Sequence, residues 1–154
     1  MPPFSGVRIA TESDEPEIYN LLMLMHRECA PFSLSDRKVR AQIVSGTHKT
    51  GGIIGVVDGK NGIEATIGLS IGQDWYSEDW RLSELWNFVH PAHRKEGHAP
   101  KLVNFSKWCA DTMMLPLLIN AVENKKTEAK VRLYKRMVPI MGMLFMYNNS
   151  SDRT

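Results

Sequence analysis

The segment HPAHRKEGHAP, residues 90–100, joins an apolar run to an amphipathic one. If a helix starts here, its first N–H groups have no partner inside the helix and carry partial positive charge from the helix dipole. Gly97 would let the backbone turn so that these groups point at one spot, and the small Ala99 would let a ligand approach closely. Arg94 and Lys95 add positive charge. These residues predict a cradle for a diphosphate, with a simple helix-capping turn as the alternative.

The histidines of this segment offer a second interpretation, a metal site. His90, His93 and His98 lie on one irregular loop without a fourth ligand nearby, and their spacing matches no zinc pattern. We therefore expect no metal, and we interpret the histidines as polar loop residues. The alternative is a regulatory protein that binds a metal ion through this loop. A chelator would change the stability of such a protein.

The spacing Arg94-x-x-Gly97-x-Ala99, directly after a strand that ends in Val-His-Pro, resembles the acetyl-coenzyme-A motif of the GNAT N-acetyltransferases, Arg/Gln-x-x-Gly-x-Gly/Ala. The segment RLYKRM (132–137) is similar to the family's Leu-Tyr-x-Lys/Arg segment. With the order of elements, the resemblance extends over nearly the whole chain and suggests a small member of the bacterial and phage type. The chain departs from the family at Val138-Pro139, where Gly-Phe is usual.

The resemblance implies acetyl-CoA as cosubstrate, with its pantetheine arm paired to the backbone of Phe88 and Val89 and its pyrophosphate in the cradle. Thr127 stands where many members have an asparagine before the last helix. The cofactor-binding residues implied are Phe88, Val89, Arg94, Lys95, Glu96, Gly97, His98, Ala99 and Thr127. The resemblance also implies that Tyr134 points at the cofactor's sulfur and protonates the departing thiolate; otherwise it fills core space.

Glu84 is the candidate general base. It lies on a predicted central strand, and two-residue alternation places it on the same face as Trp86 and Phe88. A carboxylate there either pairs with a base in the core or faces a cleft, where burial would raise its pKa and suit it to deprotonate an ammonium group. Glu78 and Asp79 are its substitutes.

The loop DWYSEDW, residues 74–80, mixes three acids with three aromatic residues. Such a loop is either a surface turn pinned by its rings or a wall that attracts a cationic amine. We expect Trp75, Tyr76, Glu78 and Asp79 to contact the acceptor substrate.

Hydrophobic periodicity predicts the framework that positions these residues. The predicted strands are 7–10, 53–57, 63–71, 81–89, 115–122 and 142–147, and the predicted helices are 13–29, 35–44, 98–114 and 127–137. This order predicts an α/β (α+β) fold. The resemblance implies a GNAT-like mixed, mostly antiparallel sheet flanked by helices, in which strands 84–89 and 117–122 splay. We expect one domain over residues 1–147 and a polar tail over 148–154.

Composition narrows the function. The chain has 154 residues, 43% of them hydrophobic, and a net charge of only +2, so nothing favours nucleic acid as a partner. Two cysteines suggest buried thiols in a reducing compartment. Without a membrane-spanning run or a signal peptide, the expected location is the cytoplasm. The sequence leaves a homodimer open.

We expect an N-acetyltransferase that transfers an acetyl group to a primary amine of a small molecule or protein by direct attack on the thioester. The alternative is a catalytically inactive CoA-binding or partner-binding protein on the same fold.

Overall fold

The computed structural model describes the chain outside residues 1–4, 121–126, 143–146 and 148–154. Its elements in chain order are β1 (Arg8–Ile9), η1 (Glu12–Asp14), α1 (Glu15–Cys29), α2 (Asp36–Thr47), β2 (Gly52–Gly59), β3 (Gly62–Gln73), β4 (Trp80–Val89), η2 (Pro91–His93), α3 (His98–Met113), β5 (Leu117–Leu118) and α4 (Thr127–Met137). The predicted strand 142–147 falls largely outside the described residues, and the predicted tail 148–154 falls entirely outside them. None of the described helices is long and apolar enough to cross a bilayer.

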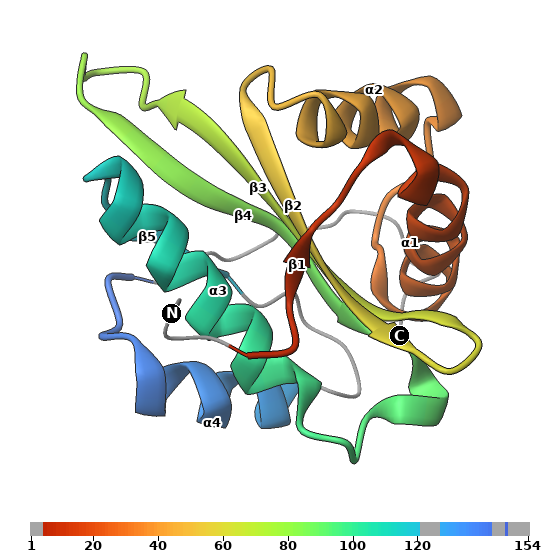
Figure 1. The fold of residues 1–154 in the computed structure, drawn as a ribbon. Helices are drawn as coiled ribbons and strands as arrows, with labels where there is room; N and C mark the ends of the chain where they lie inside the picture. The colour runs from red at the N-terminus through yellow and green to blue at the C-terminus, as the bar shows by residue number, and fades with distance from the viewer. Residues whose placement is uncertain (1–4, 121–126, 143–146, 148–154) are drawn as a thin grey trace.

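The strands form one sheet in the order β1-β2-β3-β4-β5, antiparallel except for the parallel pair β4–β5. Figure 1 shows α1 and α2 on one side of the sheet and α3 and α4 on the other. Each side has its own core: residues of α1 and α2 pack against one face, and residues of α3 pack against the other. The predicted mixed α/β fold is confirmed.

The first two helices follow the sequence signals closely. In α1, Ile18, Leu21 and Leu22 are buried along one stripe. The side chain of Ser35 accepts a hydrogen bond from the N–H of Lys38 and caps α2. The helix α2 runs on to Thr47, beyond the predicted end at residue 44, and includes Gly46. A side chain at that glycine would overlap Ile54, so the glycine lets α2 lie close against β2.

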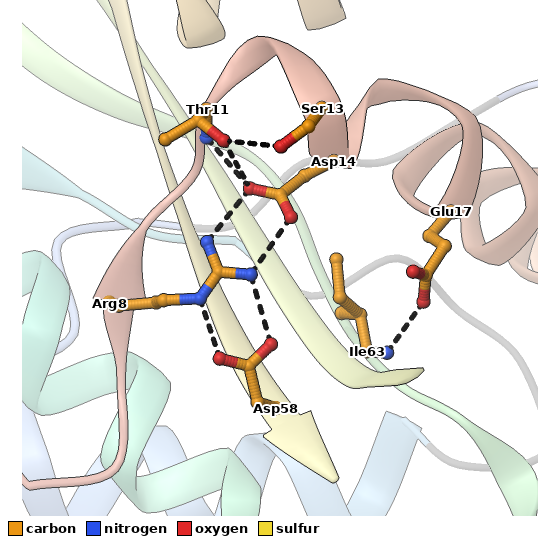
Figure 2. A network of polar contacts seen from close by, with 7 residues as sticks. All are labelled: Arg8, Thr11, Ser13, Asp14, Glu17, Asp58 and Ile63. Atoms are coloured by element: carbon orange, nitrogen blue, oxygen red, sulfur yellow. Dashed lines mark hydrogen bonds and ion pairs between the residues drawn. The ribbon is translucent and has the colours of Figure 1, made fainter. Parts of the chain in front are cut away.

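A polar network ties the N-terminal segment to the hairpin (Figure 2). The guanidinium of Arg8 donates to both carboxylate oxygens of Asp14, at 2.8 Å each, and to those of Asp58, at 2.6 and 2.9 Å. The carboxylate of Asp14 also accepts a hydrogen bond from the backbone N–H of Thr11 at 2.7 Å. This bond caps the start of η1. These contacts hold β1 and the start of α1 against β2.

A β-bulge at Leu85 interrupts β4. Gly68 of β3 pairs with Trp86, whereas the next residue, Leu69, pairs with Glu84, so Leu85 is the extra residue. Leu82, before the bulge, packs on the α3 side of the sheet, whereas Trp86, after it, packs on the α1 side. The expected alternation across the whole strand is therefore wrong: Glu84 does not share a face with Trp86 and Phe88.

The strand β5 is much shorter than the predicted 115–122. Its ladder comprises Leu82 with Leu117 and Ser83 with Leu118, and both leucines of β5 are only partly buried. Two residues later the side chain of Asn120, rather than its backbone, donates to the carbonyl of Glu84 at 3.2 Å. Within the described residues, β4 and β5 therefore part directly after this short ladder.

Candidate active site

Glu84 and Tyr134 form a buried hydrogen-bonded pair beside the point where β4 and β5 part. The Tyr134 hydroxyl donates to the Glu84 carboxylate, 3.0 Å from Oε2 and 3.3 Å from Oε1. The two side chains are only 6% and 8% exposed. The residues predicted as base and acid thus come together from a strand and a helix that are distant in sequence.

Burial raises the pKa of Glu84 to about 7, although the charge of Lys130 and the hydrogen bond from Tyr134 oppose this rise. A carboxyl group that titrates near neutrality can both accept and return a proton at physiological pH. Burial, followed by the negative charge of Glu84, raises the pKa of Tyr134 above its ordinary value. Tyr134 therefore stays protonated and remains a donor.

Past the end of the β4–β5 ladder, the edge of β4 presents backbone carbonyl groups, and side chains donate hydrogen bonds to two of them. Lys130 Nζ donates to the carbonyl of Asn87 at 2.9 Å, and Asn120 reaches the carbonyl of Glu84. The side-chain Nδ2 of Asn87 is buried and makes no hydrogen bond of ordinary geometry among the described residues. It lies close enough to Glu84 and Tyr134 to lower the pKa of each.

The backbone of Phe88 does not face this edge. The N–H of His90 donates to the carbonyl of Glu64 on β3, and alternation then turns Phe88 toward β3 as well. Asn87 and Val89 turn to the open side, as the bond from Lys130 to Asn87 shows. Of the two residues predicted to pair with the pantetheine arm, only Val89 presents its backbone there, and Asn87 replaces Phe88.

The predicted cradle has the expected backbone. Gly97 caps α3 in the left-handed region, with φ 76° and ψ 24°. A β-carbon placed there would have no other atom within 4 Å, so the space in front of it is open. The N–H groups of Gly97, His98 and Ala99 have no hydrogen-bond acceptor within the described part of the chain. Lys95 is exposed beside them.

Three charged or polar side chains of this loop contact protein instead of the cradle. Arg94 pairs with Glu28 of α1 at 2.6 Å, so a protein carboxylate balances its charge, and its role beside the cradle stays a prediction. Glu96 contacts His93 at 3.0 Å. The ring of His98 is buried and contacts a carboxylate of β3. The backbone N–H groups and Lys95 are therefore the groups left for the predicted cradle.

The remaining predicted residues lie away from the pair. Trp75 is 95% exposed, and its ring meets that of Tyr76 edge-on at 5.4 Å. Glu78 and Asp79 are exposed and precede β4, whose first residue is four positions before Glu84, about 13 Å along the strand. They are therefore out of hydrogen-bond reach of a group at Glu84 and do not fit the role of substitute base. Thr127 begins α4, and its side chain lies outside the described residues.

Sequence reasoning missed Lys130, Asn87 and Asn120. A signal for Lys130 was available, because it lies four residues before Tyr134 on one helix and therefore shares its face. Asn87 was hidden by the bulge, which shifts it to the side of Glu84.

No protein-family model and no curated protein matches the chain. Solved structures do. A GCN5-related N-acetyltransferase from Ralstonia eutropha JMP134 is 19% identical with a TM-score of 0.72, over 94% of this chain and 97% of that one. The chain has the GNAT fold. The resemblance drawn from the sequence is confirmed at this level.

Two further structures show what else this fold carries. The ribosomal-protein-alanine N-acetyltransferase of Brucella melitensis biovar Abortus 2308 is 13% identical, with a TM-score of 0.70 over 94% of this chain and 97% of that one. AAC(6')-Iy, in complex with a bisubstrate analogue of CoA and acetylneamine, is 11% identical, with a TM-score of 0.71 over the same shares. Structures with the GNAT fold thus include acetyltransferases named for different acceptors.

Proposed function

We propose that the chain is an acetyl-CoA-dependent N-acetyltransferase, in which a primary amine of a small molecule or protein attacks the thioester directly. The observation that carries the proposal is the hydrogen-bonded pair of Glu84 and Tyr134 at the parting of β4 and β5. One buried carboxyl group with a pKa near 7 and one protonated phenol are the proton acceptor and donor that this reaction needs.

The residues present fit the cofactor. The free N–H groups of residues 97–99 and the charge of Lys95 suit its pyrophosphate. The open edge at Val89 suits the amides of its pantetheine arm. Acetyl-CoA supplies an activated acetyl group, and binding at these remote groups would fix that group beside the acceptor.

The proton steps follow from the pair. Glu84 accepts a proton from the acceptor ammonium, directly or through water, and the free amine forms the new C–N bond. Tyr134 gives its hydroxyl proton to the departing sulfur and regains one from Glu84, 3.0 Å away. The second proton lost by the nitrogen passes to solvent, so the products are an amide, a thiol and one proton.

A catalytically inactive CoA-binding or partner-binding protein is the second candidate. Its partner-binding form is favoured by one contact: Lys130 already occupies the carbonyl of Asn87, an acceptor that an extended cofactor arm on β4 would use.

Two measurements separate these functions. Acetyl-CoA should raise the melting temperature of the wild type, and Gly97→Trp should abolish this rise, because it fills the open space at the cradle and strains a left-handed position. The control is Gly51→Trp, since Gly51 also has a positive φ of 97° and lies in the turn before β2. Thiol release is then assayed with a panel of aminoglycosides, peptides and simple amines.

Thiol release with any amine of the panel supports the transferase. A thermal shift without transfer supports the inactive binder. No shift at millimolar acetyl-CoA would remove the transferase and the CoA binder and leave the partner-binding protein.

A further inference from the structure

Four side chains meet beside the start of α3: Glu64 on β3, His93 in η2, Glu96 in the turn that follows, and His98 as the first residue of α3. His93 Nδ1 lies 3.0 Å from Glu96 Oε1 and 3.5 Å from Glu64 Oε1. His98 Nε2 lies 2.8 Å from Glu64 Oε2 and 3.4 Å from Glu96 Oε2. Each carboxylate therefore turns one oxygen to each imidazole.

The donor atoms on the His93 side have the spacing of a metal shell. One ligand atom each from Glu64, His93 and Glu96 lies within 4.8 Å of the other two. A tetrahedral ion with bonds of about 2.0 to 2.1 Å requires ligand atoms about 3.3 Å apart. The two separations from His93 Nδ1, 3.0 and 3.5 Å, bracket this value.

Charge also favours a cation here. The ion-pair partners of Glu64 and Glu96 in the described part of the chain are the two imidazoles, which are charged only when protonated. Glu64 is largely buried, with 14% of its side chain exposed. Paired carboxylates in such a place are costly unless a positive charge balances them.

His98 contacts both carboxylates through the oxygens that do not face His93. Its ring is 7% exposed, and its Nδ1 is buried without a hydrogen-bond partner among the described residues. The polar contacts of this ring are therefore those of Nε2 with the two carboxylates. Ligating carboxylates are commonly held by such an outer donor, which leaves their other oxygens turned to the ion.

We propose that Glu64, His93 and Glu96 bind a divalent first-row transition metal ion, with His98 orienting the carboxylates and a fourth position open to solvent. One imidazole and two carboxylates suit zinc or manganese better than calcium, which takes more oxygen ligands. The sequence predicts no metal because no further ligand lies near the loop histidines along the chain. In the folded chain, Glu64 from β3 supplies that ligand. The ion would tie the loop to the sheet, whether or not the chain transfers acetyl groups.

The test is calorimetric titration of the full chain with zinc chloride, after chelator treatment and dialysis. We expect one ion per chain, and Glu96→Gln should weaken binding at least about tenfold. Glu96 is chosen because its side chain is 49% exposed, so the change should leave the fold intact. His90→Asn in the same loop is the matched control and should bind zinc as the wild type does. Calcium chloride should give no comparable heat.

Absence of saturable zinc binding to the wild type would overturn the proposal. So would equal affinity of the wild type, Glu96→Gln and Glu64→Gln, which would place the ion on other residues. If Glu64→Gln fails to fold, Glu96→Gln decides the question, with circular dichroism as the check on its fold.

Discussion

Replacing Lys130 with methionine isolates the effect of one charge on Glu84. The methionine keeps the length and packing of the side chain but removes the positive charge that opposes the effect of burial. Without this charge the pKa of Glu84 should rise from about 7. A nearby opposite charge shifts a carboxyl pKa by about one to three units, and partial exposure of Lys130 favours the lower end, so the expected pKa of Glu84 in the variant is about 8.

The consequence for the rate depends on pH. At pH 7 the ionised fraction of Glu84 should fall from about one half to about one tenth, and kcat/KM should fall roughly fivefold with it. At pH 9 Glu84 is ionised in both proteins, so their rates should converge.

The assay measures kcat/KM from pH 6 to 9 for wild type, Lys130→Met and the control Lys135→Met, an exposed position on the same helix. The ratio of variant to wild type cancels the ionisation of the acceptor amine. A uniform loss at every pH would show that Lys130 acts through binding. A ratio of one throughout would refute the role of Glu84 as base.

Three other changes test the site and its framework. Tyr134→Phe should lower kcat about 10²-fold with little change in KM, measured by thiol release, and an unchanged kcat would contradict its role as acid. Asp14→Asn tests the N-terminal network: the hydrogen bond from Arg8 lowers the pKa of Asp14 from 3.8 to about 2, so its carboxylate contributes stability above pH 4 that is lost as pH falls toward 2. The variant should lose about 2 kcal/mol in urea unfolding at pH 7, and its deficit relative to wild type should shrink as the pH approaches 2; equal stability at pH 7 would contradict this. Deleting Leu85 should give a folded protein, because the remaining residues alternate regularly, but it should abolish transfer activity, because β4 loses the bend that the bulge introduces where it parts from β5; an active deletion variant would show that the bulge is dispensable.

Most of the framework could be predicted from the sequence because periodicity reports which residues are buried. The stripe in α1 and the apolar hairpin strands are strong local signals. The extent of β5 could not be predicted, since the run LPLLINAV carries the same apolar composition whether its backbone pairs or departs from β4. The end of α2 was missed because a glycine signals a turn by default, whereas here it allows close packing on Ile54.

The candidate site also has features that the sequence predicts and features that it does not. The left-handed glycine at the start of α3 could be predicted, because the local chain dictates that turn. Where side chains point depends on distant partners: Arg94 turns to Glu28 of α1, a contact 66 positions away in sequence. Glu64 carries no signal in its own segment, and only the pairing of β3 with β4 brings it to the loop histidines.

The bulge at Leu85 explains why these features occur together. Before the bulge, β4 pairs with the β5 segment: the N–H of Leu82 donates to the carbonyl of Pro116, the residue directly before β5. The extra residue moves the open-edge position to Asn87 and Val89 and frees Trp86 for the α1 core. A regular strand with this sequence would place Trp86 beside Glu84, where the large ring would fill the space that Tyr134 and Asn87 occupy. One inserted residue thus lets β4 turn Glu84 and Asn87 to one face of the sheet and Trp86 to the other.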